Sequence, residues 1–409
     1  MAAHIMPQTA MAVVRPRLEV ADIFRLHGEQ YRSRHHLSPE QHKAMRDIQR
    51  CRTSALGGHL DVCDQGCGYT AISYNSCRNR NCPKCQGLQS AKWLQDRLQH
   101  ILPIDYFHVV VTQPHEANPL ILHNQRTMYD MFFKATAQSL LELTQQGERR
   151  QMQPGFTAVL HTWNQDLGFH PHLHLVVTAG GLDVSQTKWI PTSDNFLVHM
   201  GALAKKIRGK FLDMLKKAYA KGELAFHGNI QHLADPGAFG EFIESLRVKE
   251  WILHTEKPFN GPQQVFQYLS RYTHRVAISN QRLIAFDETG VTFRYKDYRR
   301  DGAERYGAMT LATDEFIRRF MLHGLPKGFH RIRHYGLLAN AGRKANVARA
   351  RALLAVPPVD EPAEPAVPPE PRPPCPCCGG HMIIIETFQR WMQPRAPPAS
   401  PASTGMLAT

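Results

Sequence analysis

Cysteine placement restricts the fold of this chain more than any other feature of its sequence. Six of the nine cysteines lie between Cys51 and Cys85, and the other three lie near the end of the 409-residue chain. Cys63-x3-Cys67 and Cys82-x2-Cys85 are two short hooks, a spacing that lets four thiolates surround one tetrahedral zinc ion. The sequence therefore predicts that these four residues hold a structural zinc ion and are not simply buried thiols.

The same segment contains three further potential ligands, Cys51, His59 and Cys77. They are candidates for a second zinc site, but three ligands leave one of the four positions unfilled. Buried structural roles are therefore an equal alternative for them. Basic residues lie on or beside the second hook and are expected to face DNA. These are Arg78, Arg80 and Lys84.

The C-terminal cysteines supply only half of a metal site. Cys375 and Cys378, with His381, offer three ligands at most, and together with Cys377 they are alternatively a flexible knuckle without metal. The 19 residues before them, 356–374, include nine prolines. Such a composition favours an extended, semi-rigid linker over a packed element.

The charge balance indicates the kind of partner. Lys and Arg outnumber Asp and Glu by 49 to 35, which gives a formal net charge of +14. This surplus favours a polyanion such as nucleic acid, although a soluble basic surface has the same composition. No apolar run approaches the roughly 18 residues of a membrane span, and the first residues lack the pattern of a signal peptide. We therefore expect no membrane partner and a cytoplasmic, nucleoid-associated protein, in agreement with the odd number of cysteines.

Alternating helix and strand patterns predict an α+β domain around an antiparallel sheet. Two helices are expected within 20–50, the second beginning at Ser38-Pro39, and further helices at 88–102, 120–146, 196–219, 237–247, 262–273, 314–323 and 337–353. Strands are expected at 106–114, 156–164 and in the segment that follows Gly168, and a further pair is expected around Thr289-Gly290. The strand at 156–164 should pair with the one after Gly168 across a turn.

The stretch "GFHPHLHLVVTAGG" (168–181) places two histidines on one face of a strand. Successive strand residues alternate between faces, so His172 and His174 point the same way, while Leu173 is buried behind them. Pro171 is expected to begin the strand, which leaves His170 in the preceding turn. Two adjacent imidazoles suit a divalent metal ion, but such a pair is also common on a half-buried face.

Two tyrosines in "PQQVFQYLSRYTHRVAISNQRL" (262–283) form the second chemical feature. Tyr268 and Tyr272 are four residues apart on an expected helix, so they share a face about 6 Å apart along its axis. Aromatic pairs at this spacing usually pack into cores, but Arg271 and Arg275 oppose burial of the whole turn and are candidate DNA contacts. A phenol becomes a nucleophile when its target phosphate is polarised, and a divalent metal ion can do this. The two histidines and two tyrosines together are consistent with a DNA-nicking site.

Two basic stretches interleaved with aromatic residues are candidate contacts to single-stranded DNA, "FRYKDYRR" (293–300) and "FHRIRHYG" (329–336). Each is alternatively a solvated edge of the fold. Their candidate DNA-binding residues are Arg294, Lys296, Arg331 and Arg333.

The chain resembles the rolling-circle, double-tyrosine transposases of the IS91 type, which belong to the His-hydrophobe-His (HUH) endonuclease superfamily. The matching segments run in order over about residues 20–390: "CRTSALGGH", "YNSCRNRNCPKCQ", "YFHVVVTQP", "LHTWNQDLGFHPHLHLVVTAGGL", "YLSRYTHRVAISN", "EFIRRFMLHGLPKGFHRIRHYGLL" and "CPCCGG". This resemblance implies a ferredoxin-like catalytic palm behind a small zinc-binding domain, with single-stranded DNA as substrate. It implies that His172 and His174 are metal ligands and that Tyr268 and Tyr272 are nucleophiles.

The resemblance also suggests a division of the chain. We expect a flexible N-terminus (1–19), a helical, zinc- and DNA-binding domain (20–100), a tyrosine transposase domain (101–355), the proline-rich linker (356–374), and a small Cys knuckle with a disordered tail (375–409). This sequence departs from the family at Asn81, where a histidine is expected, and at the first hook, which more often has two intervening residues. The first departure weakens the case for a second zinc ion.

Members of this superfamily usually take a third metal ligand from a neighbouring strand or from the tyrosine helix. Gln165 is our candidate, with His161 and His170 as competitors, and a structural amide is an equal alternative for Gln165. A ligand set of two histidines and an amide suits Mg²⁺ or Mn²⁺ better than zinc.

We therefore expect a transposase of an insertion sequence that nicks and rejoins single-stranded DNA through 5′-phosphotyrosine intermediates. A host helicase and replication proteins are candidate partners. The absence of a GxxxxGK[ST] motif opposes a replication initiator with a fused helicase, and relaxases would not be expected to carry the zinc module. The alternative from another class is a non-enzymatic zinc protein that binds nucleic acid.

Overall fold

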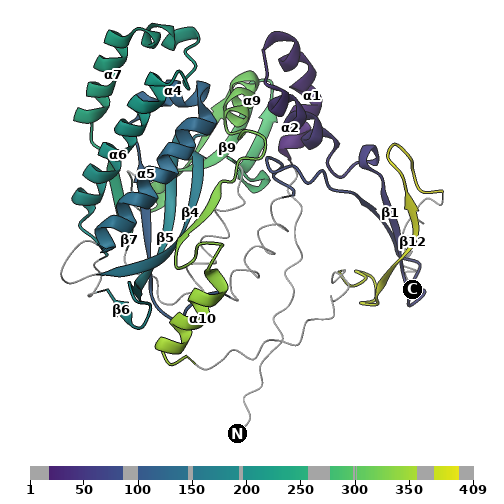
Figure 1. Ribbon diagram of the computed structural model, residues 1–409. Coiled ribbons are helices and arrows are strands. Elements are labelled where there is room, and N and C mark those ends of the chain that lie inside the picture. The colour runs from purple at the N-terminus through teal and green to yellow at the C-terminus, as the bar shows by residue number, and fades with distance from the viewer. Residues whose placement is uncertain are drawn as a thin grey trace, which may run out of the picture.

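The described residues form three antiparallel sheets with helices packed on them (Figure 1). The structure, a computed structural model, describes residues 18–85, 100–145, 151–192, 197–256, 277–297, 300, 302–356 and 373–395. Most of the helix expected at 88–102 and all of the helix expected at 262–273 lie outside these residues, as does most of the proline-rich linker.

The largest sheet has the strand order β11-β4-β5-β3-β7, and β6 pairs with β5. Its strands are β3 (Tyr106–Thr112), β4 (Met152–Trp163), β5 (Phe169–Asp183), β6 (Trp189–Pro191), β7 (Ile252–Glu256) and β11 (Ile332–Gly336). The four central strands β3, β4, β5 and β7, numbered 1 to 4 among themselves in chain order, lie side by side in the order 4-1-3-2. Helices follow strands 1 and 3 of this set. This is the ferredoxin-like arrangement, and the predicted α+β fold is confirmed.

One face of this sheet is covered by helices α4 (Asn118–His123), α5 (Gln125–Gln145), α6 (Met200–Ala220) and α7 (Pro236–Val248), as Figure 1 shows. Apolar strand residues such as Val109, Leu160 and Leu173 are fully buried in the core beneath them. Because side chains alternate along a strand, the intervening residues of β3, β4 and β5 point to the opposite face. That face carries a group of histidines.

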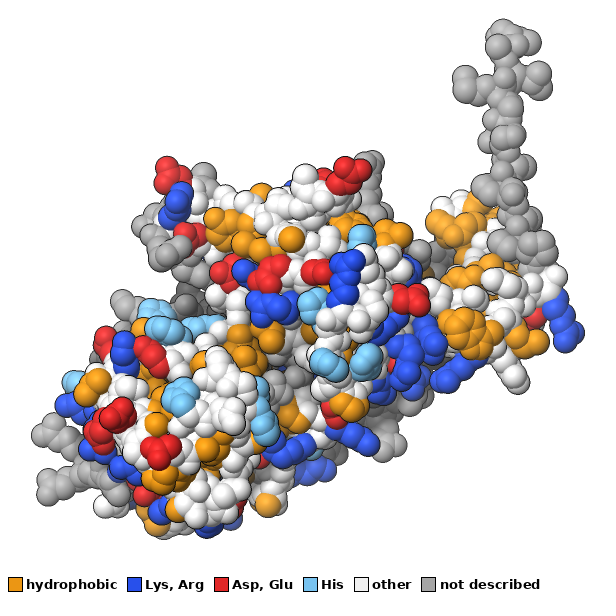
Figure 2. Space-filling view, turned by 90° about the horizontal axis from the view of Figure 1, so that it is seen from above, with side chains coloured by type: hydrophobic (Ala, Val, Ile, Leu, Met, Phe, Trp, Pro, Cys, Tyr) orange, Lys and Arg blue, Asp and Glu red, His pale blue; other side chains and the backbone are white. Residues whose placement is uncertain are grey.

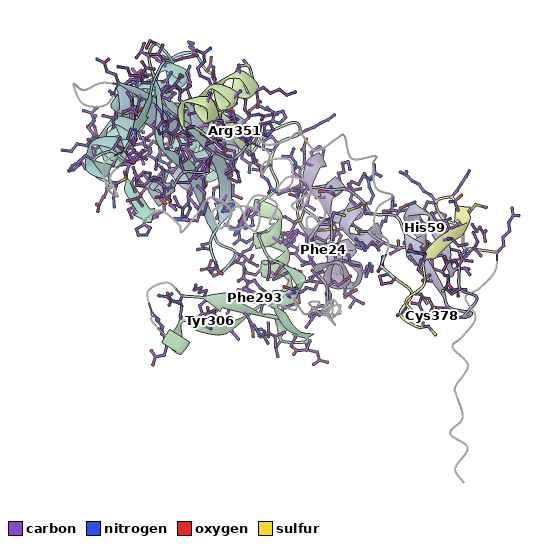
Figure 3. All side chains as sticks on the ribbon, turned by 90° about the horizontal axis from the view of Figure 1, so that it is seen from below. Phe24, His59, Phe293, Tyr306, Arg351 and Cys378 are labelled. Atoms are coloured by element: carbon purple, nitrogen blue, oxygen red, sulfur yellow. The ribbon has the colours of Figure 1, made fainter. Side chains whose placement is uncertain are left out.

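A second core joins the N-terminal helices to a hairpin and a helix from much later in the chain. It contains α1 (Val20–Arg34), α2 (Pro39–Arg50), β8 (Leu283–Asp287), β9 (Gly290–Lys296) and α9 (Thr313–Leu322), while β10 (Tyr306–Leu311) extends the β8–β9 hairpin into a sheet. The Phe24 and Phe320 rings meet edge to face at 5.3 Å, and Figure 3 shows Phe24 and Phe293 in this part of the molecule. The predicted start of α2 is confirmed, since the Ser38 hydroxyl accepts a hydrogen bond from the Gln41 amide.

The third sheet joins segments from both ends of the chain, in the order β12-β1-β2. It contains β1 (Gly58–Cys63), β2 (Thr70–Tyr74) and β12 (Met382–Phe388), and it projects from the rest of the molecule at the right of Figure 1. The C-terminal cysteine segment was expected to form a small unit of its own. Here it instead joins the N-terminal region, because β12 pairs with β1 over six residue pairs. We call the sheet β12-β1-β2 with its connecting turns the N-terminal module.

Helix α10 (Arg343–Leu353) packs against the far end of the large sheet through Val347 and Ala350. Among the helices that the structure describes, none has the length and apolar character needed to cross a membrane.

Candidate active site and cysteine clusters

Three histidines converge on the face of the large sheet opposite to the one that helices α4 to α7 cover. His172 and His174 lie on β5, and His161 on β4 pairs directly with His172. One ring nitrogen from each of the three lies within 4.8 Å of the others. The Nε2 atoms of His172 and His174 are 3.0 Å apart.

Hydrogen bonds fix the orientation of two of these rings. The Nδ1–H of His172 donates to the carbonyl oxygen of His170 at 2.7 Å, so the Nε2 of neutral His172 carries a lone pair. The Nδ1 of His174 lies 2.9 Å from Nε2 of His108, a buried residue of β3. When His174 donates from Nδ1 to His108, its Nε2 also presents a lone pair, and the two lone pairs face one another.

Burial keeps these imidazoles uncharged. It lowers the pKa of His172 to about 4 and the pKa of His174 well below its ordinary value. Two nitrogens that bind one ion at about 2.1 Å and at an angle of about 90° lie about 3.0 Å apart, which is the separation observed here. The residues therefore fit a shared divalent ion.

The third member of the cluster is His161, whereas Gln165 was our first candidate. Gln165 lies in the turn between β4 and β5, where its carbonyl oxygen accepts a hydrogen bond from Arg282. His161 stands directly beside His172 because β4 and β5 are paired strands. His170 lies outside the cluster and contributes only its backbone carbonyl.

His108 escaped the sequence analysis, although a signal was present. The strand "YFHVVVT" alternates, so His108 takes the face opposite to Phe107 and Val109. Recognising it as a partner of His174 required knowing that β3 and β5 are neighbours.

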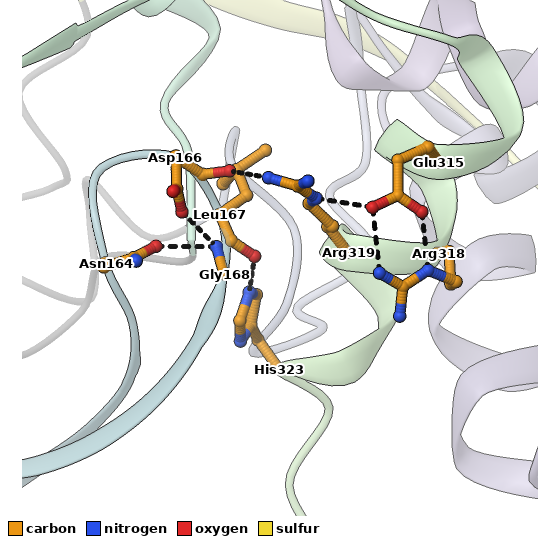
Figure 4. Close-up of polar contacts among 8 residues, drawn as sticks. All are labelled: Asn164, Asp166, Leu167, Gly168, Glu315, Arg318, Arg319 and His323. Atoms are coloured by element: carbon orange, nitrogen blue, oxygen red, sulfur yellow. Dashed lines mark hydrogen bonds and ion pairs between the residues drawn. The ribbon is translucent and has the colours of Figure 1, made fainter. Parts of the chain in front are cut away.

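The turn that precedes the histidine strand is held from several sides (Figure 4). Leu167 adopts the left-handed conformation with φ +65°, and its fully buried side chain enters the second core. Arg319 of α9 donates to the carbonyl oxygen of Asp166 at 2.9 Å, and His323 donates to that of Leu167 at 3.1 Å. These contacts set where β5 begins and therefore where His172 lies.

The cysteines form two groups of four, and the two predicted hooks do not share one site. Cys82 and Cys85 join Cys51, at the end of α2, and Cys77, with all four sulfur atoms within 4.8 Å of one another. The Sγ atom of Cys85 lies 3.5 Å from that of Cys51 and 3.6 Å from that of Cys77. The second hook therefore supplies two ligands that complete a site with Cys51 and Cys77.

Cys63 and Cys67 instead meet Cys375 and Cys378, and these four sulfur atoms also lie within 4.8 Å of one another. His59 belongs to neither group, because its Nε2 atom lies 3.2 Å from a carboxylate oxygen of Asp61. Figure 3 shows His59 and Cys378 toward opposite ends of the module. Cys377 is exposed and lies outside the cluster.

The basic residues proposed for DNA contact differ in their surroundings. Arg78 and Arg294 are exposed. Arg80 donates to the carbonyl oxygen of Phe329, and Lys84 pairs with Glu19. Lys296 lies over the ring of Tyr306 at 5.7 Å.

Two further candidates for DNA contact, Arg331 and Arg333, lie just before and within the edge strand β11. Burial lowers the pKa of Arg331 to about 10. Arg333 pairs with Asp130 and stacks on Phe133 at 4.3 Å, so it packs β11 against α5. The four remaining candidates, Tyr268, Arg271, Tyr272 and Arg275, lie outside the described residues.

Comparison with known proteins identifies the two regions separately. Residues 23–113 match the family described as "Transposase zinc-binding domain", and residues 155–346 match the family described as "Putative transposase". The first match contains one complete cysteine group, and the second contains the three-histidine cluster.

Two relatives extend these matches over most of the chain. The sequence is 46% identical to "Putative transposase y4qJ" of Sinorhizobium fredii, over 83% of this chain and 84% of that protein. It is 29% identical to "Transposase for insertion sequence element IS801" of Pseudomonas savastanoi pv. phaseolicola, over 71% of this chain and 68% of that protein. No solved structure matches the chain significantly. The chain therefore belongs to the transposase family that combines an IS91-type transposase zinc-binding domain with a transposase domain.

Proposed function

We propose that this transposase nicks and rejoins single-stranded DNA through 5′-phosphotyrosine intermediates and so drives rolling-circle transposition of an insertion sequence. The observation that carries the proposal is the convergence of His161, His172 and His174 on the face of a ferredoxin-like sheet that lies opposite to its helices. A non-enzymatic DNA-binding protein would have no need for three imidazoles directed at one point.

The proposed nucleophiles are Tyr268 and Tyr272. The phenolic oxygen forms a bond to the DNA phosphorus, the bond from that phosphorus to the 3′ oxygen breaks, and the freed 3′ oxygen takes up a proton. The phosphodiester energy is kept in the phosphotyrosine, so rejoining needs no nucleotide cofactor. The segment that contains both tyrosines follows β7, whose last residue, Glu256, pairs with His108 of β3.

We propose Mg²⁺ or Mn²⁺ as the ion held by His161, His172 and His174. When bound, it would polarise the phosphate and stabilise the charge that develops during transfer. The protein's own contribution is to orient the ligands. The His170 carbonyl keeps a proton on Nδ1 of His172. His108 would do the same for His174 when His174 donates from Nδ1, and both Nε2 atoms are then available.

The zinc-binding domain supports the palm structurally in this proposal. Cys51, Cys77, Cys82 and Cys85 would hold zinc at the end of α2, and three of the four belong to the second core. Single-stranded element ends and target DNA are the proposed substrates, with a host helicase supplying the strands.

The test measures nicking and binding separately on labelled single strands that carry an element end. We expect His161→Ala, His172→Ala and His174→Ala each to lower nicking by 100-fold or more while binding changes little, because backbone charge contacts dominate affinity. Gln165→Ala should retain most activity. His254→Ala is the matched control, since this exposed histidine of β7 shares the sheet face but lies outside the cluster.

Equal loss of binding and nicking in the three cluster variants would contradict the proposal, because it would give the histidines a structural role. Mass spectrometry of the wild-type protein after reaction should find the nucleotide adduct on Tyr268 or Tyr272. An adduct on another residue would overturn the assignment of the nucleophiles.

A further inference from the structure

We infer that Cys63, Cys67, Cys375 and Cys378 form a second structural zinc site that clasps the C-terminal segment onto the N-terminal module. Two of these ligands lie far beyond residues 23–113, which match the zinc-binding domain. The site therefore goes beyond both that domain and the proposed function.

The sulfur atoms are arranged around a common point. The Cys63 and Cys378 Sγ atoms are 3.3 Å apart, and those of Cys67 and Cys375 are 3.5 Å apart. Sulfurs bound to one tetrahedral zinc ion at about 2.3 Å lie about 3.8 Å from one another. The ligand set is complete, and four thiolates are the set that structural zinc sites use most readily.

The backbone around the cluster is folded into two tight turns that fit against each other. Gly66 and Gly379 adopt left-handed conformations, with φ of +67° and +78°. The Asp64 amide donates to the His381 carbonyl at 2.9 Å, and the His381 amide donates to the Asp64 carboxylate at 3.0 Å. A Cβ atom on Gly380 would lie 2.4 Å from the Gln65 side chain, so only glycine permits this approach.

A metal ion would strengthen the docking of the C-terminal segment, which otherwise rests on the pairing of β12 with β1. Strand β12 exposes Ile383, Ile384 and Ile385, with 48%, 39% and 56% of their surface accessible, so it buries little apolar surface on the module. Of its large side chains, Phe388 is buried, and its ring meets Tyr74 edge to face. Four zinc–thiolate bonds would hold the strand where its own packing is weak.

The experiment measures zinc per chain by elemental analysis of full-length protein. We expect two zinc ions in the wild type, one in Cys375→Ser and one in Cys378→Ser. Cys377→Ser is the matched control and should keep two, because Cys377 is exposed and outside the cluster. Hydrogen exchange should show loss of protection in β12 and β1 of the two one-zinc variants, with the large sheet unchanged.

One zinc ion in the wild type, or two in both Cys375→Ser and Cys378→Ser, would overturn the second site. Neither result would bear on nicking by the histidine and tyrosine residues. The retained zinc ion and the unchanged large sheet show that a variant has folded, so a loss of metal cannot be attributed to general unfolding.

An independent observation leads to a second proposal: the pocket between α2 and the C-terminal segment binds a nucleotide of single-stranded DNA. This proposal rests on DNA being the substrate, as proposed above. The pocket has a volume of about 390 Å³, and its lining includes Arg32, Arg46, Arg50 and Trp391. Within the described part of the chain, no carboxylate lies within ion-pairing distance of these three arginines.

Trp391 is presented to solvent in an unusual way. Its side chain is 68% exposed, and its backbone has φ +67°, a conformation that large side chains rarely adopt. A hydrogen bond from its amide to the Ser54 carbonyl at 2.8 Å holds this turn on the module. The Arg50 guanidinium lies 5.2 Å from the centre of the indole ring.

An exposed indole beside several arginines is a combination that binds single strands, because bases stack on the ring while phosphates pair with the guanidinium groups. Duplex DNA offers its phosphates but not its base faces, so the indole favours a single strand. Figure 2 shows Lys and Arg side chains gathered where the main body meets the projecting module.

The test uses full-length protein and an oligothymidylate of about 15 nucleotides. We expect Trp391→Ala to weaken binding about tenfold, the loss of one stacked base. Met392→Ala is the control, since its neighbouring side chain is exposed but does not line the pocket. The double variant Arg46→Ala, Arg50→Ala should lower the slope of log affinity against log salt by about 1.4.

Fluorescence locates the contact. The oligonucleotide should quench the tryptophan fluorescence of the wild-type protein. This quenching should be smaller in Trp391→Phe, although phenylalanine can still stack on a base. Unchanged affinity in Trp391→Ala together with unchanged quenching in Trp391→Phe would overturn the pocket, and so would equal binding of a matched duplex. If the wild type binds and nicks single strands in that case, the proposed function stands without this site.

Discussion

At the scale of single residues, histidines serve two different purposes in this protein. His161, His172 and His174 direct ring nitrogens at one point, whereas His323 has both of its nitrogens engaged. The Nδ1 atom of His323 lies 3.2 Å from the Thr162 hydroxyl, and its Nε2 donates to the Leu167 carbonyl. Burial lowers the pKa of His323 to about 4, so the ring stays neutral in the folded protein.

This shift predicts that His323 makes a pH-dependent contribution to the stability of the protein. In the unfolded chain its pKa is near 6.5, so the unfolded state takes up a proton first as the pH falls. The contribution of neutral His323 to the free energy of unfolding is full above about pH 6.5, decreases between pH 6.5 and 4, and is lost below pH 4. The total loss of stability is about 3 kcal/mol. His323→Gln keeps a donor for Leu167 but does not titrate. Denaturant unfolding at pH 7.5 and pH 4.5 should therefore show a smaller difference for the variant, and an equal difference would contradict the assignment.

At the scale of elements, the sequence predicted what depends on neighbouring residues. The Ser38 cap, the pairing of β4 with β5 and the shared face of His172 and His174 follow from local patterns, and the structure has all three. The grouping of the cysteines does not follow from spacing, because Cys63 and Cys67 find their partners more than 300 residues away. For the same reason the sequence did not predict that β12 pairs with β1. His161 was named only as a competitor of Gln165, because the register that places it beside His172 is not contained in the spacing. Such pairings are decided by topology, which a local pattern does not contain.

Helix α9 offers a test of how an element positions the histidine strand. Arg319 bonds to the Asp166 carbonyl and to Glu315, whereas its neighbour Arg318 bonds to Glu315 but not to the turn. Arg319→Met should release the turn before β5, lower nicking about tenfold and raise the Mg²⁺ concentration needed for half-maximal activity. Arg318→Met removes a similar charge and should change neither value more than about twofold. If the two variants behave alike, the effect comes from the loss of Glu315 pairing and not from the turn.

At the scale of the whole molecule, the two largest hydrophobic cores of the described residues are separate from one another. The first lies between the large sheet and helices α4 to α7. The second contains α1, α2, β9 and α9 together with Cys51, Cys82 and Cys85, and it receives Leu167 from the turn before the histidine strand. The group of Cys51, Cys77, Cys82 and Cys85 and the turn before the histidine strand therefore both pack into the second core.

This arrangement predicts that removal of zinc from Cys51, Cys77, Cys82 and Cys85 will unfold the second core but not the first. Structural zinc supplies folding free energy only to the segments it holds, and the large sheet has a separate apolar core. Calorimetry of Cys85→Ser should show an early transition that is separated from the melting of the sheet. Hydrogen exchange should show lost protection in α1, α2 and α9 and retained protection in β4, β5 and α5. Nicking should fall even so, because the turn at Leu167 loses its anchor. A single transition with uniform loss of protection would mean that the two cores form one cooperative unit.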